Sequence, residues 1–329
     1  MVRLLSREDV SSVLSMPDAL GSVEDAFKQL VLGTARVPPR IVMGEPAAGT
    51  TLVMPGVIGG GMNALATKIV SVYKDNPAKY GKPTILAKIM VQDMETGDIV
   101  GIMDGGLITA MRTGAATGVS VKYLARKDSR VMGIFGAGVQ ARKQVHAVFW
   151  ALDRKLERCI VHDIMRTAAE TFRVELEKEL GISIEIADGG DRLLKGTDII
   201  VTASTSITPL FEGEKVAEGT HVSSIGAHAP AHHEIDTALI RRASITAADY
   251  QPACLAEAGE YIKAVKEGVI SPQNIISIGD IITGRRPGRT DERQITVFKS
   301  VGISAQDVAV AKLVYDRALQ KGIGKDIDF

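Results

Sequence analysis

The chain has 329 residues, no formal net charge and an isoelectric point near 7, with 45% hydrophobic and 24% charged residues. This composition is that of an ordinary globular protein, long enough for about two domains. Because no net positive charge would attract nucleic acid or an anionic membrane, we expect neither as a partner. The apolar runs are shorter than a membrane span, no signal peptide is recognisable, and the cysteines show no metal-binding spacing, so we expect a cytoplasmic protein.

The first part of the chain predicts helical structure followed by strands. Ser6 and Asp9 have the spacing of a capping box and open a helical region over about 7–32, which Gly33 ends. Strands are predicted at 51–54, 66–73, 85–92 and 98–103. A helical pattern rich in small residues follows over 109–125.

From Arg130 the pattern changes to short apolar runs that alternate with helical segments, which is typical of βαβ units and a parallel sheet. These runs lie at 131–135, 159–163, 182–187, 198–203, 221–226, 244–248 and 295–298, and a helix over 304–320 closes the chain. We therefore predict an α/β protein with a Rossmann-type doubly wound parallel sheet over 125–300. An α+β domain over 1–124 would collect 301–329, and its exposed strand edges favour a dimer.

A Gly-rich turn joins the first strand of the Rossmann-type region to its helix. It reads Gly133-Ile-Phe-Gly136-Ala137-Gly138-Val139-Gln140-Ala141. Gly136 and Gly138 let the backbone turn sharply and approach a pyrophosphate, and Ala141 lets the helix pack on the strand. The helix N-terminus presents unpaired N–H groups to the phosphates. This order predicts a dinucleotide site; the alternative is a Gly-rich turn without a ligand.

An acid stands at the end of the next strand. Asp163 follows Gly138 by 25 residues, where a carboxylate can accept hydrogen bonds from the adenosine ribose and repel a 2′-phosphate. This favours NAD(H) over NADP(H). Arg166 offers a partner for a 2′-phosphate, so NADP(H) remains possible.

Three cations of the first domain are candidate ligands for a carboxylate. Lys68 lies on an apolar strand face, where it binds a substrate or passes a proton, or else reaches water from an edge strand. Arg112 lies among small residues and suits a bidentate contact; the alternative is an ion pair with an acid such as Asp104. Arg40 follows the rigid Pro38-Pro39 segment and is a candidate second ligand.

Three histidines crowd into the segment 225–234. His228, His232 and His233 lack the spacing of common zinc ligands, so we predict no metal. Because His228 follows a strand at the edge where a nicotinamide is expected, it is a candidate proton donor.

Together these residues resemble the ornithine cyclodeaminase/mu-crystallin family along nearly the whole chain. The resemblance rests on Val37-Pro-Pro-Arg40, Met54-Pro55, Thr67-Lys68, Gly81-Lys-Pro-Thr84, Glu95-Thr-Gly97, Met103-Asp104, Arg112-Thr113, Gly136-Ala-Gly-Val-Gln140, Ser224-Ile-Gly226 and Ile295-Thr-Val-Phe-Lys-Ser-Val-Gly302. It implies hydride transfer between a nicotinamide and the α-carbon of an amino or imino acid. It also implies a homodimer whose N-terminal domain dimerises and binds the substrate carboxylate through Arg40, Lys68 and Arg112.

The predicted catalytic residues are Lys68 and His228, the lysine assisting proton transfer. The predicted cofactor-binding residues are Thr113, Gly136, Ala137, Gly138, Val139, Gln140, Asp163, Arg166, Thr202, Ala203, Ser204, Ser224, Ile225, Gly226 and Lys299.

Two departures from the family pattern narrow the activity. Ornithine cyclodeaminases carry an acid in the loop that matches 225–228 and another two residues before the Met-Pro pair, where this chain has His228 and Leu52. A diamino acid needs acidic partners for its ammonium, so ornithine and lysine are disfavoured. The archaeal alanine dehydrogenase type has the loop acid and a basic residue near Met-Pro, and both are missing.

We therefore predict an NAD(P)H-dependent reductase of a small cyclic imino acid, with Δ1-pyrroline-2-carboxylate to L-proline as the first expectation. Reductive amination of a 2-oxo acid is the second possibility. Ornithine cyclodeamination and a non-catalytic nucleotide-binding role follow.

Overall fold

The computed structural model describes residues 1–44 and 49–328. The chain divides into two compact units, Met1–Arg112 with Ile303–Phe329, and Thr113–Gly302. One division falls within helix α4 (Gly105–Leu124), before the predicted boundary between residues 124 and 125.

The first unit is a mixed sheet with helices packed against it. Its strands run in the order β16-β1-β7-β6-β5-β4-β2, with β3 on β4, and only the β1–β7 pair is parallel among the pairs of this sheet. The elements are β1 (Val2–Leu5), α1 (Arg7–Val13), α2 (Met16–Leu32), β2 (Ala35–Arg36), β3 (Ile41–Met43), β4 (Thr50–Ile58), β5 (Ala64–Val72), α3 (Asn76–Tyr80), β6 (Ile85–Gln92), β7 (Ile99–Asp104), α12 (Ser304–Lys321) and β16 (Lys325–Ile327).

The predicted helical region over 7–32 is two helices rather than one. Ser6 and Asp9 form the predicted capping box of α1. A second capping box, Ser15 with Asp18, then starts α2 after a break at extended Leu14. The helix ends at Gly33, whose φ of 80° is the left-handed conformation that glycine adopts easily.

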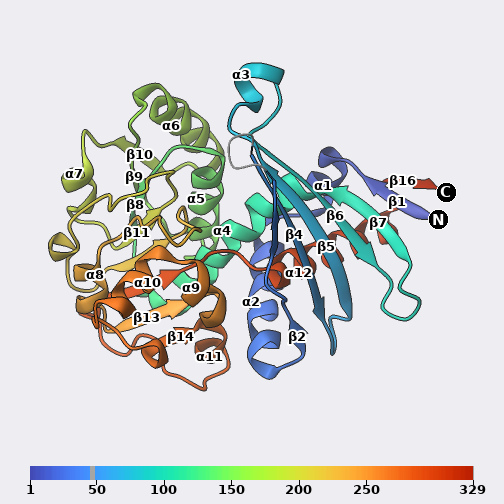
Figure 1. The fold of residues 1–329 in the computed structure, drawn as a ribbon. Helices are drawn as coiled ribbons and strands as arrows, with labels where there is room; N and C mark the ends of the chain where they lie inside the picture. The colour runs from blue at the N-terminus through green and yellow to red at the C-terminus, as the bar shows by residue number, and fades with distance from the viewer. Residues whose placement is uncertain (45–48, 329) are drawn as a thin grey trace. The chain divides into compact units, whose positions relative to one another are not determined.

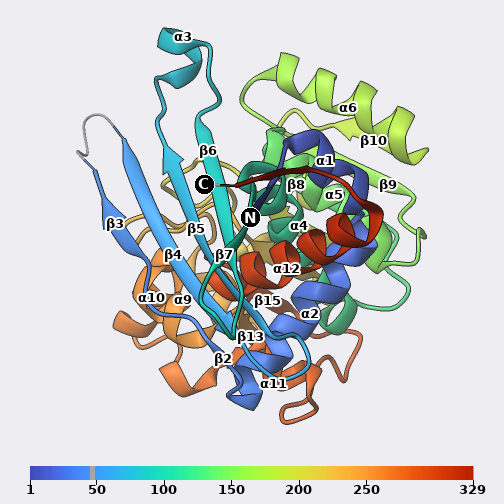
Figure 2. The ribbon, with the colours of Figure 1, turned by 90° about the vertical axis from the view of Figure 1, so that its right-hand side faces the viewer.

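Helix α12 lies against β4, β5 and β6, as Figure 2 shows for the C-terminal helix and the central strands. Alternate residues of β5, Ala66, Lys68 and Val70, are buried. Gly56 of β4 is opposite Ala66 and so close to α12 that an added Cβ would lie 2.8 Å from the Ser304 hydroxyl. The sheet and α12 therefore bury Lys68 between them.

The second unit confirms the predicted Rossmann-type sheet. All its paired strands are parallel, in the order β10-β9-β8-β11-β12-β15-β13-β14. Helices α5 and α6 lie on one face and α7 and α8 on the other (Figure 1). The elements are β8 (Val131–Phe135), α5 (Val139–Ala151), β9 (Arg158–His162), α6 (Arg166–Leu180), β10 (Ser183–Ile186), α7 (Gly190–Leu194), β11 (Ile199–Thr202), η1 (Gly213–Lys215), β12 (His221–Ser224), α8 (Thr237–Arg242), β13 (Ile245–Ala248), α9 (Gln251–Glu257), α10 (Gly259–Lys266), η2 (Pro272–Asn274), β14 (Ile275–Ser277), α11 (Ile278–Ile282) and β15 (Thr296–Lys299).

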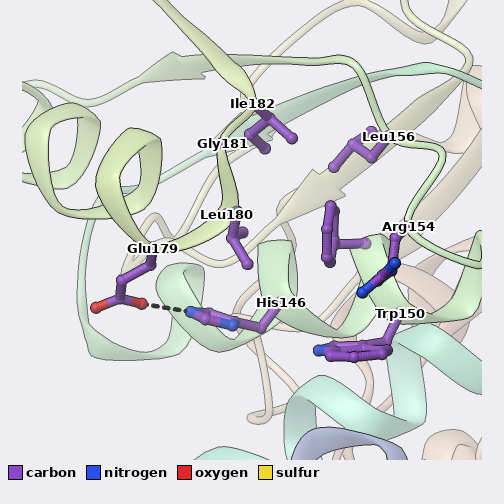
Figure 3. Close-up of a pocket in the computed structure, with 9 residues that line it drawn as sticks. His146, Trp150, Arg154, Leu156, Glu179, Leu180, Gly181 and Ile182 are labelled. Atoms are coloured by element: carbon purple, nitrogen blue, oxygen red, sulfur yellow. Dashed lines mark hydrogen bonds and ion pairs between the residues drawn. The ribbon is translucent and has the colours of Figure 1, made fainter.

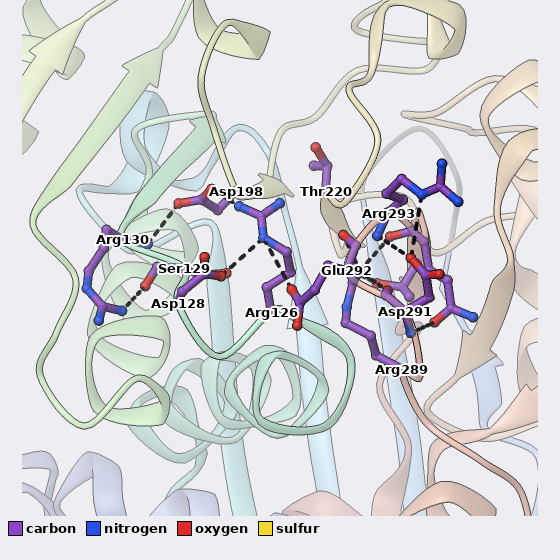
Figure 4. Close-up of polar contacts among 12 residues, drawn as sticks. Arg126, Asp128, Ser129, Arg130, Asp198, Thr220, Arg289, Asp291, Glu292 and Arg293 are labelled. Atoms are coloured by element: carbon purple, nitrogen blue, oxygen red, sulfur yellow. Dashed lines mark hydrogen bonds and ion pairs between the residues drawn. The ribbon is translucent and has the colours of Figure 1, made fainter.

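A polar cluster fixes the edge of this sheet where the strands begin (Figure 4). The Asp198 carboxylate accepts hydrogen bonds from the backbone N–H groups of Arg130 and Val131 at 2.8 and 2.9 Å and pairs with Arg126. Arg289 donates to the carbonyl oxygen of Leu124 at 2.8 Å. These contacts join the segments that precede the strands. In parallel sheets of this kind ligands bind at the opposite edge, where the strands end.

Across the residues that the structure describes, no helix combines the length and hydropathy needed to cross a membrane.

Candidate active site

The Gly-rich turn lies at the point where the strand order of the parallel sheet reverses, between β8 and β11. Gly136 has a φ of +103°, and its N–H donates to the His162 carbonyl at 2.8 Å. A Cβ on Gly136 would lie 2.6 Å from the carbonyl oxygen of Ala203. Both backbone conformation and space therefore require glycine here.

Gly138 has a different reason to be glycine. It is the N-cap of α5 with an ordinary φ of −79°, and no atom lies within 4 Å of a Cβ built on it. No side chain caps the helix N-terminus, and the Val139 side chain is exposed. Gln140 Oε1 is buried without a hydrogen-bond partner in the described part of the chain. The open space at Gly138 and the uncapped backbone N–H groups at the start of α5 fit a pyrophosphate that approaches the backbone.

The Asp163 carboxylate lies beside this turn. Its Oδ2 accepts from the Ala137 N–H at 2.7 Å, and its Oδ1 accepts from the Met165 N–H at 2.8 Å. Each oxygen retains a second lone pair, so the acid can still accept from ribose hydroxyls. Arg166 contacts the carboxylates of Asp188 at 3.3 Å and Glu170 at 3.4 Å. The acids around Arg166 favour a ribose hydroxyl over a 2′-phosphate.

The ends of β11 and β12 are held together by one buried carboxylate. Glu234 accepts from the Thr202 hydroxyl at 2.8 Å, from the Ser204 N–H and hydroxyl at 2.8 and 2.6 Å, and from the Gly226 N–H at 2.7 Å. Three predicted cofactor-binding residues thus share this acceptor. Their backbone is fixed before any ligand binds, which is the preorganisation that a binding site requires.

A second buried carboxylate, Glu260, lies beneath the same strand ends. It accepts from Lys299 Nζ at 2.9 Å, from the Ser224 hydroxyl at 2.8 Å and from the Glu234 N–H at 3.4 Å. Both Lys299 and Glu260 are fully buried. The burial changes the role expected of Lys299, since its ammonium supports Ser224 from below rather than reaching the surface.

In the first unit, Lys68 of β5 and Arg112 of α4 both contact Asp307 of α12. Lys68 Nζ lies 2.6 Å from Asp307 Oδ2, and Arg112 Nε lies 3.0 Å from Asp307 Oδ1. Arg112 Nη1 also donates to Gln306 Oε1 at 2.7 Å. We call these four side chains the carboxylate cluster. The partner of Arg112 is therefore Asp307 and not Asp104, which lies near Arg7 and Lys88 instead.

The carboxylate cluster carries excess positive charge. Burial lowers the pKa of Lys68 to about 7; Asp307 opposes that shift, whereas Arg112 and Arg40 add to it. Two cations share the carboxylate of Asp307, and Arg40 is near enough for its charge to act on Lys68. A further anion would relieve this repulsion, so the cluster suits a carboxylate ligand.

His228 lies in the exposed loop after β12, and its Nδ1 is 3.1 Å from the Gly226 carbonyl. No group of three or more His, Cys, Asp or Glu side chains suited to a metal was found among the described residues. His228 stays a predicted proton donor.

A surface pocket lies at the other edge of the parallel sheet, where α5 and α6 end (Figure 3). His146 contacts Glu179 there at 2.8 Å, and the Arg154 guanidinium lies over the Trp150 ring. Because the Gly-rich turn is at the opposite ends of the strands, this pocket is not the dinucleotide site.

Four buried residues of these clusters were not predicted from the sequence: Gln306, Asp307, Glu234 and Glu260. Asp307 did have a signal, since it is the one charged residue over 303–311, where most of the other side chains are small or apolar. An acid within such a segment needs a buried cation.

The parallel sheet and its Gly-rich turn define a dinucleotide-binding α/β protein, and the residues at the turn fit NAD(H). The chain belongs to the ornithine cyclodeaminase/mu-crystallin family, whose model matches residues 2–322.

Three proteins with a named enzyme activity are similar to this chain over almost its whole length. A Thermococcus litoralis Δ1-pyrroline-2-carboxylate reductase, solved with NADH and L-proline, is 40% identical with a TM-score of 0.94, covering 99% of this chain and 100% of that one. An archaeal alanine dehydrogenase dimer with bound NAD is 36% identical with a TM-score of 0.92, covering 100% and 99%. The Archaeoglobus fulgidus alanine dehydrogenase is 37% identical over 99% of this chain and 98% of its own length.

Proposed function

We propose that this protein reduces Δ1-pyrroline-2-carboxylate to L-proline, with NADH as the hydride donor. Family membership and the similarity to a reductase solved with NADH and L-proline support the reaction class. The observation that carries the substrate class is the buried, positively charged carboxylate cluster.

The apolar surroundings of this cluster support a small substrate with no second ammonium. Leu52 and Met54 alternate on the same face of β4, and Met54 is opposite Lys68 in the neighbouring strand. Leu52 packs against Met54, Val70 and Ala87. A diamino acid would need an acid for its side-chain ammonium, and position 52 offers only an apolar side chain.

In the proposed mechanism, Arg112 and Arg40 hold the substrate carboxylate and so fix the position of the imine carbon. Most of the acceleration comes from this positioning. Lys68 holds a proton for the imine nitrogen, with His228 as the other candidate donor. When bound, the reduced nicotinamide supplies the hydride. The products are L-proline and NAD⁺, and one proton is consumed for each hydride transferred.

The second candidate is reductive amination of a 2-oxo acid such as pyruvate. The similarity to two alanine dehydrogenases favours it, and the same cations would hold the carboxylate. The apolar Leu52 and the histidine at 228 favour the ketimine, because the alanine dehydrogenase type differs at both positions.

We infer that the first unit binds the substrate and dimerises, and that the second binds the dinucleotide. The sheet face that α12 does not cover supports dimerisation, since Ile69 and Leu86 on it are 39% and 42% exposed. On the neighbouring β3, Ile41 is 55% exposed and, being opposite Val53, belongs to the same face as Ile69. An apolar surface of this kind fits a second copy of the chain. A monomeric mass at micromolar concentration in gel filtration with light scattering would contradict the dimer.

The proposed activity is tested with purified protein and NADH by following absorbance at the nicotinamide band. Rapid NADH oxidation is expected with Δ1-pyrroline-2-carboxylate, and little with pyruvate plus ammonia. The reverse pattern would assign an alanine dehydrogenase, and NAD⁺-dependent release of ammonia from L-ornithine would assign a cyclodeaminase. Binding of NADH without turnover of any of these would assign a nucleotide-binding protein.

A further inference from the structure

Asp307 connects the two cations that the proposed function requires. It lies in the first turns of α12, and each of its carboxylate oxygens accepts from a different element, Lys68 on β5 and Arg112 on α4. The exposed fractions of Lys68 and Asp307 are each 1%. Neither side chain can satisfy its charge with water, so each depends on the geometry of the cluster.

We propose that Asp307 is a positioning residue of the reductase, which orients Arg112 for the substrate carboxylate and keeps Lys68 in its protonated form. This inference rests on the proposed function. Asp307 would not contact the reacting atoms, and it would act entirely through the two cations.

The hydrogen bonds to α12 leave both cations with donors for a substrate. Lys68 uses one of its three N–H groups on Asp307, and Arg112 uses two of its five on Asp307 and Gln306. Because one bond is to Nε and the other to Nη1, on the two sides of the Cδ attachment, the two bonds fix the guanidinium plane. The two N–H groups of Nη2 and one of Nη1 are not used by these bonds and can donate to a substrate carboxylate.

Gln306 reinforces this orientation. Its Oε1 accepts from Arg112, which assigns the amide orientation, because a guanidinium can only donate. Its Nε2 is then a buried donor without a partner among the described residues. A buried unsatisfied donor beside an arginine is consistent with a site that receives an anion.

The charge state of Lys68 depends on the groups that face it from three directions. Asp307 on α12 favours the ammonium, while Arg112 on α4 and Arg40 in the segment before β3 oppose it. Burial lowers the lysine pKa to about 7, so the proton that Lys68 holds is sensitive to the loss of any one of these charges. Removing the carboxylate removes the influence that favours the ammonium and keeps those that oppose it.

The test compares Asp307→Asn with Asp316→Asn, the same chemical change on the same helix. Asp316 pairs with Lys312 at 2.6 Å and is partly exposed, so its variant should behave like the unchanged protein. For Asp307→Asn we expect kcat/KM with Δ1-pyrroline-2-carboxylate to fall about 10- to 100-fold at neutral pH, with a raised KM. The alkaline limb of its pH profile should move by about one unit or more toward lower pH. An unchanged KM and an unmoved limb would overturn the proposal.

Asp307→Glu covers the possibility that the asparagine variant fails to fold. The glutamate keeps the charge but lengthens the side chain, so we expect a raised KM with the alkaline limb near its original pH. A purely structural ion pair predicts lower stability without this separation of KM from the pH limb. A glutamate variant whose KM and limb both match the unchanged protein would overturn the proposal.

A readout that needs no turnover separates this inference from the proposed function. With ¹³C-labelled lysine, the Lys68 Cε resonance, assigned by its absence in Lys68→Met, should titrate near pH 7, and at a lower pH in Asp307→Asn. Where the chosen substrate is not turned over, that shift still supports the role of Asp307 and only the substrate assignment fails. Where the reductase is active but this resonance titrates at the same pH in both proteins, the role of Asp307 fails alone.

Discussion

The two units each bury a lysine completely, and the two lysines have opposite surroundings. Lys68 shares the Asp307 carboxylate with Arg112, so two positive charges meet one negative charge. Lys299 lies between Ser224 and Glu260, and the backbone of a second acid, Glu234, reaches Glu260. The first cluster therefore has a net positive charge, whereas in the second the ammonium of Lys299 is balanced by the carboxylate of Glu260.

We interpret the first cluster as a ligand-binding site and the second as a structural support for the strand ends. The acids of the second unit accept from strand-end hydroxyl and N–H groups, which fixes the backbone at β11 and β12. The two cations of the first unit share one carboxylate, so a second anion would reduce their remaining repulsion. Burial of a charged residue therefore does not indicate a binding site by itself. An unbalanced net charge in a buried cluster does, and its sign indicates the charge of the ligand.

The largest expected effect is on catalysis in the first unit. Lys68→Met keeps the volume and removes the cation, and we expect kcat to fall about 100- to 10,000-fold, the usual contribution of a positioned proton donor. Asp307 keeps Arg112 as a partner in this variant, so the fold should survive. NADH affinity, measured by fluorescence titration, should not change. A kcat within a few-fold of the unchanged protein would assign the role of proton donor to His228 instead of Lys68.

The same substitution in the second unit should act on stability instead. Lys299→Met leaves Glu260 buried without its only cation among the described residues, which costs about 3–5 kcal/mol of unfolding free energy. Urea unfolding followed by circular dichroism measures this loss. If Lys299→Met were as stable as the unchanged protein, the contrast between the two clusters would be wrong.

Local motifs allowed the nucleotide site to be predicted from the sequence, but not the partners of the buried charges. Gly136, Gly138 and Asp163 lie within one strand–helix–strand segment, whose spacing fixes their geometry. Asp307 is 239 residues from Lys68, and only the packing of α12 against the sheet brings them together.

Arg112 shows why the nearest acid in the sequence is a poor guide. Asp104 was the expected alternative partner, yet its carboxylate accepts from the Leu107 N–H at the start of α4. Likewise, strand order was not predictable at β15, which follows β14 in the chain but lies between β12 and β13. Both features depend on contacts between segments distant in the chain, which periodicity does not report.

A moderate effect is expected on the choice of nucleotide. Asp163→Ala removes an acceptor for the ribose hydroxyls and lets Arg166 meet a 2′-phosphate, so the preference for NADH over NADPH should fall about 10-fold. Because Asp163 also supports the Ala137 N–H, some loss of affinity for both nucleotides should accompany the change. The measurement is kcat/KM with each nucleotide. An unchanged ratio would show that this acid does not set the preference.

The smallest effect is expected at a partly exposed ion pair, which gives the scale for the buried clusters. The hydrogen bond from Arg317 lowers the pKa of Asp18 to about 2, and the side chains are 24% and 32% exposed. Asp18→Asn should cost about 1 kcal/mol at neutral pH. Because the folded pKa lies below the ordinary value of 3.8, this stabilisation is present above that pH and is lost as the pH falls toward 2. Thermal unfolding should show a difference between the two proteins at pH 7 and a smaller one at pH 2.

The most direct test of the central claim is to follow the transferred hydride. The purified protein would be supplied with Δ1-pyrroline-2-carboxylate and NADH carrying two deuterium atoms at C4, and the product examined by mass spectrometry and NMR. The account predicts L-proline one mass unit heavier, with the deuterium on its α-carbon. L-Proline without deuterium, or consumption of NADH without formation of proline, would contradict it.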